Sequence, residues 1–344
     1  MNTIAMDHAY LQYTGRVDFT NPKQPVFLFP ATSVRFRLTG KKLLVRLYNA
    51  HHLWENRLGV VVNGEQFGVE LPWDADCVID LSAHLAEGVN DVLLFKRQDS
   101  CHKVILQGME TDGELLPPPE RPRRRIEFYG DSVSAGEVTE RDDHAGQLDP
   151  PDHNARWNNI WHSYAWQCAR LLNAEISEIA QGGIALQDGR GWFPPCGMLT
   201  AWDKLAYNPH WNDVRPWDFT RWTPYVAVIA IGQNDNAQGD YMHDDYDGDL
   251  ARAWRADYRR LIANLREKYP RAYILCTTTV MMHSPEWDRA IGEVVAEIGD
   301  DRVRQFLYTG NGAVTPGHVR RCEAEKMALE LADYIEQLPN VWED

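Results

Sequence analysis

Hydrophobic and polar positions along the first third of the chain form short runs separated by turn residues. The run at residues 33–38 alternates between apolar and polar side chains, which is typical of a strand with one buried face. A further apolar run at residues 58–62 leads into Asn63-Gly64, a dipeptide that strongly favours a tight hairpin turn. The predicted strands cover residues 33–38, 43–48, 58–62, 66–71, 77–81, 91–96 and 103–106. Short strands at near-regular spacing predict an all-β sandwich of jelly-roll type over residues 1–115.

The second half of the chain has a different periodicity, with apolar strand-like runs alternating with helical patterns. Strands are expected at residues 126–129, 174–179, 225–231, 272–278 and 303–308. Helices are expected at residues 161–172, 250–268, 285–298 and 320–338. This alternation predicts an α/β domain over residues 126–344, with a parallel sheet flanked by helices on both faces.

Prolines and arginines separate the two patterns at residues 116–125. Proline lacks a backbone N–H and restricts φ, so this segment is expected to be a stiff linker and not a helix or a central strand. Its four arginines could also be interpreted as a nucleic-acid patch. A solvated hinge is favoured, because the whole chain is acidic and no aromatic residues are interleaved with the arginines.

The charge balance narrows the possible partners. The chain of 344 residues has 35 Lys and Arg against 50 Asp and Glu, giving a formal net charge of −15. A protein this acidic is a poor candidate for binding nucleic acid or an anionic membrane, whereas a neutral sugar suits it better. Its 13 tryptophans are compatible either with ordinary packing or with platforms for sugar rings.

Targeting and redox signals favour a cytoplasmic location. The first eight residues have neither the basic region nor the apolar region of a signal peptide, and no apolar run reaches bilayer length. The six cysteines are scattered without a C-x-x-C pair, which indicates reduced thiols. Neither His51-His52 nor Cys101-His102 provides the clustered ligands of a metal site, so no metal or cofactor is expected. The sequence does not indicate an oligomeric state.

Polar residues follow the predicted strands of the second half at the positions where parallel sheets carry active sites. Gly130-Asp131-Ser132 follows the first strand, where a serine can act as a nucleophile. The same tripeptide also suits a plain turn, and the two interpretations are equally compatible with it in isolation. Gly183 and Asn234 follow the next two strands and could supply oxyanion donors, although both also suit ordinary turns. His318 precedes the last helix in a Pro-Gly loop and is a candidate general base.

Taken together, these segments resemble the SGNH, or GDSL-type, hydrolases. Gly130-Asp131-Ser132, Gly183, Gly232-Gln233-Asn234-Asp235 and His318 match the four sequence blocks of these enzymes in order. The preceding β-sandwich narrows the resemblance to family-two carbohydrate esterases, which remove acetyl groups from xylan, mannan and related glycans. The resemblance implies that Ser132 is the nucleophile, that His318 is the base, and that Ser132, Gly183 and Asn234 form the oxyanion hole.

One departure from the SGNH pattern concerns the residue that orients the histidine. These enzymes place Asp two or three residues before the histidine, but Thr315 and Pro316 occupy those positions here. Some members of the esterase family use a main-chain carbonyl instead. We therefore expect a carbonyl of residues 312–316 to orient His318, with a distant Asp as the alternative. Gly317 also replaces an aromatic residue common in the family. Trp192, Trp287 and the Met281-Met282 pair are other candidates for contacting a sugar, although plain packing is the favoured interpretation of each.

The expected function is that of a serine esterase acting on acetylated xylo- or manno-oligosaccharides. Two other functions remain open. The first is a lipase or an acyl-thioesterase on the same fold, and the second is a glycan-binding protein without catalytic activity. The sequence does not indicate which sugar or which hydroxyl position would be deacetylated.

Overall fold

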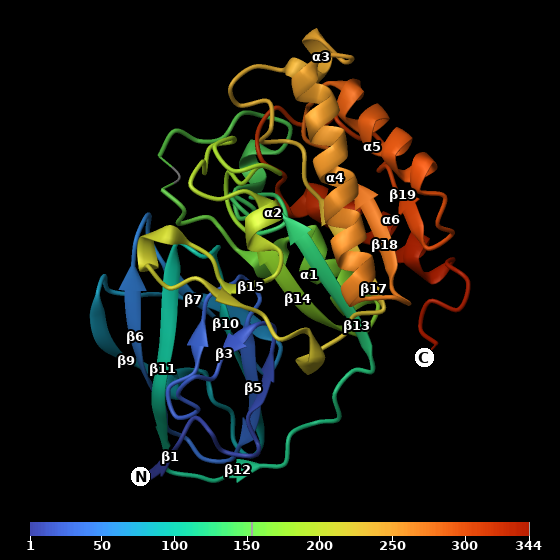
Figure 1. Cartoon of the computed structure of the whole chain (residues 1–344). Coiled ribbons are helices and arrows are strands. Elements are labelled where there is room, and N and C mark those ends of the chain that lie inside the picture. The colour runs from blue at the N-terminus through green and yellow to red at the C-terminus, as the bar shows by residue number, and fades with distance from the viewer. Residues whose placement is uncertain (153, 344) are drawn as a thin grey trace. The chain divides into compact units, whose positions relative to one another are not determined.

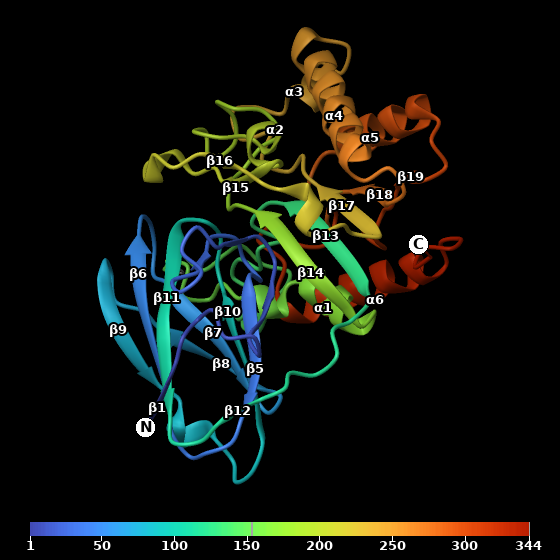
Figure 2. The same ribbon diagram turned by 60° about the horizontal axis from the view of Figure 1, so that its bottom comes forward.

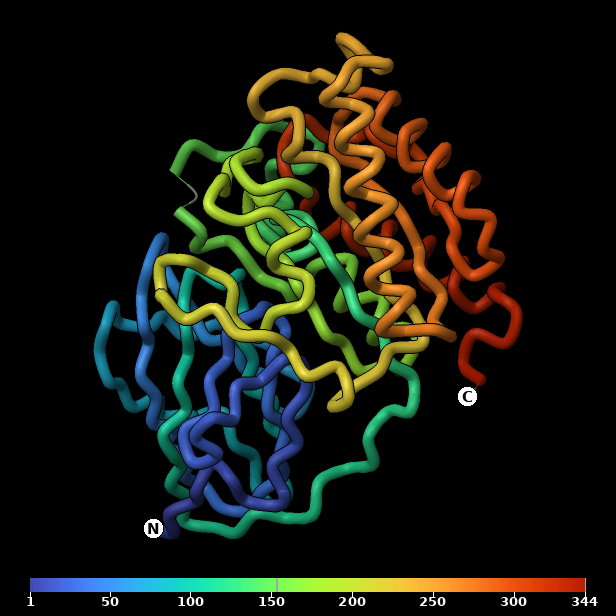
Figure 3. The backbone as a smooth tube through the Cα atoms, viewed as in Figure 1, coloured from blue at the N-terminus to red at the C-terminus, as the bar shows by residue number. Residues whose placement is uncertain are grey.

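The computed structural model describes residues 1–152 and 154–343, and its backbone divides into two compact units (Figure 1, Figure 3). The first unit contains Met1–Arg121 together with Asn154–Arg156. The second contains the other described residues from Pro122 onward. The chain passes from one unit to the other between Arg121 and Pro122, within the segment expected to be a linker.

The first unit is a sandwich of two antiparallel sheets (Figure 2). One sheet contains β3 (Val17–Asp18), β4 (Val26–Phe27), β11 (His102–Thr111), β6 (Leu43–His51) and β9 (Ala75–Asp80) in that order, with β1 (Asn2–Ile4) paired to β11. The other contains β12 (Leu115–Leu116), β5 (Ser33–Leu38), β10 (Asn90–Lys96), β7 (Arg57–Val62) and β8 (Glu65–Glu70), with β2 (Gln12–Thr14) paired to β5. Consecutive strands often lie in different sheets, so the chain repeatedly crosses the sandwich. The predicted all-β sandwich is confirmed.

Alternation along the strands accounts for the core of this unit. In β6, Leu43, Val45 and Leu47 are fully buried while the intervening Arg46 is exposed, as a period of two requires. Asn63 and Gly64 both have positive φ, 52° and 90°, which is the geometry of a two-residue turn between β7 and β8. Four short strands near the amino terminus, β1 to β4, were not predicted, because runs of two or three residues are too short to show a period.

The second unit is built on a five-stranded parallel sheet, which confirms the predicted α/β fold. The strand order is β14 (Ala174–Ala180), β13 (Arg124–Gly130), β17 (Val226–Ala230), β18 (Tyr273–Thr277) and β19 (Val303–Gln305). The longer helices are α1 (Tyr164–Leu171), α4 (Asp249–Lys268), α5 (Pro285–Ile298) and α6 (Arg321–Glu336). Figure 2 shows α4 and α5 on one face of the sheet and α1 and α6 on the other.

Several boundaries differ from those expected. Strand β19 ends at Gln305, three residues before the predicted end at residue 308. The helix predicted over residues 161–172 is a 3₁₀ turn, Ile160–His162, followed by α1. The break falls at Ser163, whose side chain caps α1 by accepting a hydrogen bond from the Ala165 N–H. Between β14 and β17 the chain forms short elements that were not expected. They are α2 (Met198–Ala201), β15 (Lys204–Ala206), β16 (Arg215–Pro216), and 3₁₀ turns at Pro209–Trp211 and Phe219–Arg221. A helix α3 (Tyr241–Asp244) and 3₁₀ turns at Ser82–His84 and Asp142–His144 complete the described elements.

The strand order explains where a site can form. After β13 the chain runs to β14 on one side, and it later returns to β17 on the other side of β13. The loops that follow β13 and β17 therefore diverge at the carboxyl end of the sheet, and ligands bind at such a switch point in open α/β sheets. Ser132 and Asn234 lie in these two loops. In the described part of the chain, no helix is long and apolar enough to span a membrane.

Candidate active site

The Ser132 loop is held by hydrogen bonds to its own backbone. The Asp131 carboxylate accepts from the Val133 N–H at 3.0 Å, and the Asp131 carbonyl accepts from the Ala135 N–H at 2.9 Å. The carbonyl of Ser132 accepts from the Glu137 N–H at 2.9 Å. Ser132 is therefore presented at the end of β13 on a fixed turn. Its residual exposure is 6%, so the hydroxyl lies largely out of solvent.

His318 lies against the Ser132 hydroxyl. The distance between His318 Nε2 and Ser132 Oγ is 2.8 Å, although 186 positions separate the two residues along the chain. Nδ1 of the same ring lies 2.5 Å from a carboxylate oxygen of Asp149. The tautomer that satisfies both contacts carries its proton on Nδ1, so that Nε2 accepts a hydrogen bond from the serine hydroxyl. This is the arrangement that a general base needs.

Asp149 orients the imidazole, and the expectation of a loop carbonyl is wrong. Its second oxygen, Oδ1, accepts hydrogen bonds from the His318 N–H at 2.9 Å and from Arg320 Nη2 at 2.8 Å. Arg320 also donates to the carbonyl of His318, and its side chain is fully buried. Asp149 is thus the distant Asp that was the alternative. It lies in a loop 169 positions from His318 in the sequence, and no motif links the two residues. An aspartate in a stretch that also contains Asp142, Asp143 and Asp152 cannot be singled out from sequence alone.

The charged groups around Asp149 and His318 shift the pKa values of both side chains. Burial disfavours the Asp149 carboxylate, but the hydrogen bonds and positive charge of His318, together with Arg320, hold the pKa of that carboxyl well below its usual range. Burial also disfavours the His318 imidazolium. The negative charge of Glu137 and the contact with Asp149 outweigh this effect and raise the pKa of His318 to about 9.

Gly183 lies after β14, on a turn that requires glycine. Its φ is +76°, and a Cβ on this residue would lie 2.8 Å from the Trp192 Cβ and 3.0 Å from the Phe193 nitrogen. The Gly183 carbonyl accepts hydrogen bonds from the backbone N–H groups of Trp192 and Phe193. Among the residues that the structure describes, no acceptor takes the backbone N–H of either Ser132 or Gly183. The backbone N–H groups of Ser132 and Gly183 are therefore available to form hydrogen bonds with an oxyanion.

Asn234 lies after β17, and its side chain joins the three loops. Nδ2 donates to Asp131 Oδ2 at 3.2 Å and to the Ile184 carbonyl at 3.1 Å. Gln233 donates to the same Asp131 oxygen at 2.8 Å. Burial raises the pKa of Asp131 to about 6, although the Val133 N–H and the Gln233 amide favour its carboxylate. Asp131 thus fixes both the serine turn and the asparagine amide.

Comparison with known proteins shows that the chain is similar to carbohydrate esterases. The protein-family model described as Carbohydrate esterase 2 N-terminal matches residues 13–119. An acetylxylan esterase / glucomannan deacetylase from Cellvibrio japonicus is 25% identical over 346 residues, covering 98% of this chain and 91% of that protein. The solved family two carbohydrate esterase from Clostridium thermocellum, in complex with cellohexaose, superposes with a TM-score of 0.77 at 26% identity. That match covers 95% of this chain and 98% of the solved one.

The chain is similar to the family-two carbohydrate esterases over nearly its whole length.

Two further matches agree with this placement. The cellulase/esterase CelE of Acetivibrio thermocellus is 29% identical over 296 residues, covering 86% of this chain. The chain spans only about a third of that longer protein, as the matched 34% of its length shows. A family two carbohydrate esterase structure from Cellvibrio japonicus has a TM-score of 0.81 at 22% identity, covering 99% of this chain and 98% of that one, which supports the fold.

The residues expected to contact a sugar fall into two groups. Trp287 is 1% exposed and its indole N–H donates to Asp240 at 2.9 Å, so it is a packing residue and not a platform. Trp192 is 76% exposed and lies in the loop that packs on Gly183. Met282 is also exposed, and its backbone N–H donates to the Thr315 carbonyl in the loop that carries His318. Trp192 and Met282 therefore remain accessible to a ligand.

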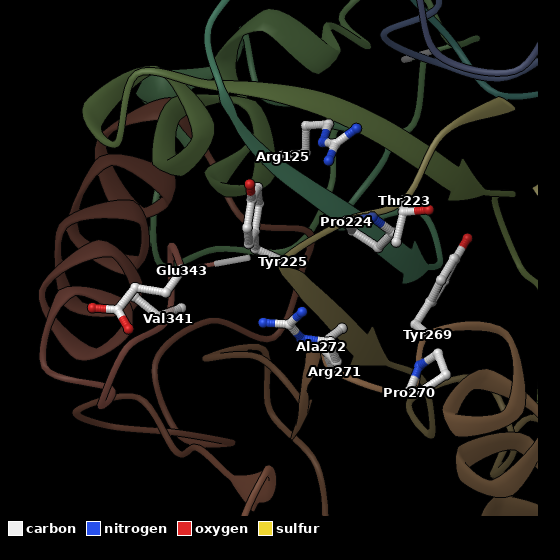
Figure 4. Close-up of a pocket in the computed structure, with 10 residues that line it drawn as sticks. All are labelled: Arg125, Thr223, Pro224, Tyr225, Tyr269, Pro270, Arg271, Ala272, Val341 and Glu343. Carbon is white, nitrogen blue, oxygen red and sulfur yellow. The ribbon is translucent and has the colours of Figure 1, made fainter. Parts of the chain in front are cut away.

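A cavity of about 180 Å³ in the second unit lies at the opposite end of the sheet (Figure 4). It is lined by Arg125, Tyr225 and Ala272, which stand at or just before the amino ends of β13, β17 and β18. None of its lining residues is a serine, a cysteine or a histidine, so it offers no equivalent of the Ser132–His318 pair. In residues 1–152 and 154–343, no three His, Cys, Asp or Glu side chains gather as metal ligands.

Proposed function

We propose that the chain is a serine esterase that removes O-acetyl groups from plant-glycan oligosaccharides, through an acetyl-enzyme on Ser132. The observation that carries this proposal is the continuous hydrogen-bonded series from Ser132 Oγ through the His318 ring to Asp149. A hydroxyl, a base and an orienting carboxylate in this order are the components that acyl transfer needs.

The mechanism follows from the positions of the donors and acceptors. Ser132 Oγ attacks the acetyl carbonyl while its proton moves to His318 Nε2. The resulting oxyanion accepts hydrogen bonds from the backbone N–H groups of Ser132 and Gly183, and from the Asn234 amide once it gives up one of its present acceptors. His318 then protonates the departing sugar oxygen. A water molecule repeats the sequence on the acetyl-enzyme, which releases acetate and restores the serine.

A glycan acetyl ester is the preferred substrate class on two grounds. The relative from Cellvibrio japonicus is named for acetylxylan and for glucomannan, which supports both xylo- and manno-oligosaccharides as substrates here. The formal charge of −15 also favours a neutral ligand over an anionic one.

The test is acetate release from acetylated xylo- and manno-oligosaccharides by the parent protein and by Ser132→Ala. We expect the variant to lose at least about a thousandfold in turnover, because the nucleophile is absent. Ser134→Ala is the matched control: it removes a neighbouring buried hydroxyl that bonds to Tyr164, so it should keep most of the activity. If Ser132→Ala keeps most of the parent activity, the proposal fails.

The two alternative functions make different predictions. A lipase or acyl-thioesterase would hydrolyse long-chain model esters faster than acetyl esters, so a comparison of acyl lengths separates it from the proposed esterase. A glycan-binding protein without catalysis was suggested by the missing Asp before His318. That support is gone, because Asp149 occupies the orienting position. Release of acetate by the parent protein excludes this function.

A cytoplasmic location remains part of the proposal, with imported acetylated oligosaccharides as substrates. Its support is that none of the six cysteines is paired in a disulfide. Fractionation of cells that express the native gene would test it, and recovery of the protein in the secreted fraction would contradict it.

A further inference from the structure

Two carboxylates flank the His318 ring, one at each nitrogen. Asp149 lies 2.5 Å from Nδ1, while Glu137 Oε2 lies 3.8 Å from Nε2. The side chains of His318 and Glu137 are only 17% and 20% exposed, so solvent screens their interaction weakly. Nothing in the SGNH sequence blocks described above assigns a role to Glu137.

Glu137 is held in this position by the same turn that presents the nucleophile. Its backbone N–H donates to the Ser132 carbonyl at 2.9 Å, so the carboxylate is tied to the serine loop. Among the residues that the structure describes, the charged groups around the imidazole come from three segments. Asp131 and Glu137 follow β13, Asp149 lies in a separate loop, and Arg320 precedes α6. The Arg320 guanidinium bonds Asp149 Oδ1 and the His318 carbonyl, so the positive charge is on the Asp149 side of the ring.

We propose that Glu137 is a positioning residue that acts through His318, stabilising the imidazolium at Nε2 while Ser132 has given up its proton. This inference rests on the proposed esterase function. The proton passes from Ser132 Oγ to Nε2 and then to the leaving sugar oxygen, and Glu137 exchanges no proton in either step. Its negative charge lowers the energy of the ion pair formed with the tetrahedral intermediate, in the way that Asp149 does from the other nitrogen.

The negative charge of Glu137 also raises the pH that the reaction needs, because it raises the pKa of His318. Burial lowers the pKa of His318, and among the groups that oppose it the charge of Glu137 has the largest effect, giving a pKa of about 9. His318 can accept the serine proton only when it is neutral. The value of kcat/KM should therefore rise with pH through the pKa of His318. Removing the Glu137 charge lowers this pKa and moves the rise to lower pH.

The experiment compares the parent with Glu137→Gln and with Asp143→Asn, using 4-nitrophenyl acetate between pH 5 and 10 as the assay range. Glu137→Gln should lower the apparent pKa by about one unit, so that kcat/KM reaches its plateau about one pH unit lower than in the parent. At the alkaline plateau its kcat should fall, because the imidazolium is less stabilised. Asp143→Asn removes an equal charge from a side chain that is 65% exposed and paired to Arg141, so the profile should not move.

An NMR titration of the imidazole provides a readout that does not depend on catalysis. We would measure the pKa of His318 in Ser132→Ala and in Ser132→Ala combined with Glu137→Gln. The signal of His318 can be identified among the 12 histidines by its absence in His318→Gln. A lower pKa in the double variant supports the inference, and equal values in the two proteins would overturn it. If the parent releases no acetate, the esterase proposal fails, yet this titration still decides the role of Glu137.

Discussion

The side chain of Asp149 takes part in three hydrogen bonds, and two of them are with His318. One oxygen faces the ring nitrogen Nδ1, and the other accepts from the His318 backbone N–H and from Arg320. A carboxylate fixed at both oxygens cannot rotate away without breaking at least one of these bonds. The imidazole therefore keeps the tautomer and the orientation in which Nε2 faces Ser132.

Replacing Asp149 by Asn tests this orienting role. The amide has nearly the same shape but no charge, and it can donate to Nδ1, which would stabilise the tautomer with its proton on the wrong nitrogen. We expect kcat on an acetyl ester to fall by about 10³–10⁴-fold with little change in KM. Asp142→Asn, which changes a nearby aspartate paired to Arg321, serves as the control. A loss of less than tenfold in Asp149→Asn would show that another group orients His318.

Asn234 is the second residue whose role can be measured alone. Its amide donates to Asp131 and to the Ile184 carbonyl, so it must release one of these acceptors before it can donate to an oxyanion. Asn234→Ala should lower kcat by about 10²–10³-fold, the usual cost of losing one oxyanion donor. Gln233→Ala removes the neighbouring amide, which also bonds Asp131, and should have a much smaller effect on kcat. Equal losses in the two variants would mean that Asn234 acts only through Asp131.

The residues of the site differ in how far they can be read from the sequence. Ser132, Gly183, Asn234 and His318 each follow a strand or precede a helix within a short motif, so a pattern marks them. Asp149 and Glu137 act through their distance from one imidazole in the folded chain. No local spacing records that distance, so neither role could be predicted beforehand.

The loop after β13 packs against the segment that leads into α1. The Asn159 N–H donates to the Gly136 carbonyl at 2.8 Å, and Ser163 Oγ donates to the Ser134 carbonyl at 2.6 Å. Gly136 has a φ of +76°, and a Cβ on it would lie 2.5 Å from the Asn159 carbonyl oxygen. These backbone contacts hold the serine loop at a close approach that only glycine permits at this position.

Substituting Gly136 by Ala should therefore destabilise the second unit for two separate reasons. The left-handed backbone conformation costs about 1–2 kcal/mol for a residue with a Cβ. The clash with the Asn159 backbone adds about 1–3 kcal/mol. Gly146→Ala isolates the first effect, because Gly146 has a φ of +70° and nothing within 4 Å of the added atom. Thermal melting should rank the parent first, Gly146→Ala second and Gly136→Ala last. Equal melting temperatures for the two variants would show that the Gly136 loop relaxes without cost.

Individual elements were predictable where local chemistry marks both ends. Helix α5, Pro285–Ile298, has the predicted limits, because a proline occupies its first turn and Gly299 ends it at a φ of 63°. The elements between β14 and β17 were missed, because each is only two to four residues long and is defined by tertiary contacts. One such contact is the pairing of Lys204 with Pro216. A segment of this kind has no periodicity from which an element could be inferred.

At the scale of the whole molecule, the chain forms two units, and one short segment in the middle of the chain returns to the first of them, which was not predicted. The segment Asn154–Arg156 belongs to the first unit, although the chain before and after it belongs to the second unit. Glu55 accounts for this, since its carboxylate accepts hydrogen bonds from Arg156 at 2.8 Å and from Asn154 at 3.3 Å. A segment of three residues is too short to change the local composition or charge pattern, so the sequence did not indicate that it returns to the first unit.

Folding also determines which nucleophiles the molecule presents. Four of the six cysteines, Cys101, Cys168, Cys196 and Cys276, are buried, and Cys77 and Cys322 are half-buried. Burial raises the pKa of the Cys196 and Cys276 thiols to about 12, and it also raises the pKa of Cys77 and Cys322 above the ordinary value. The thiolate is the reactive form, so these thiols are poor nucleophiles at neutral pH.

We therefore expect native protein treated with a thiol-specific disulfide reagent at pH 7.5 to react at no more than two sites, and slowly. All six should react after denaturation in urea. Iodoacetamide should leave acetyl-ester hydrolysis nearly unchanged, because the proposed nucleophile is the Ser132 hydroxyl, whereas an organophosphate that phosphorylates activated serines should abolish it. Mass spectrometry would locate the organophosphate on Ser132 and find none in Ser132→Ala. Loss of hydrolysis upon thiol alkylation, with no change in the melting temperature, would contradict the assignment of Ser132 as the only nucleophile.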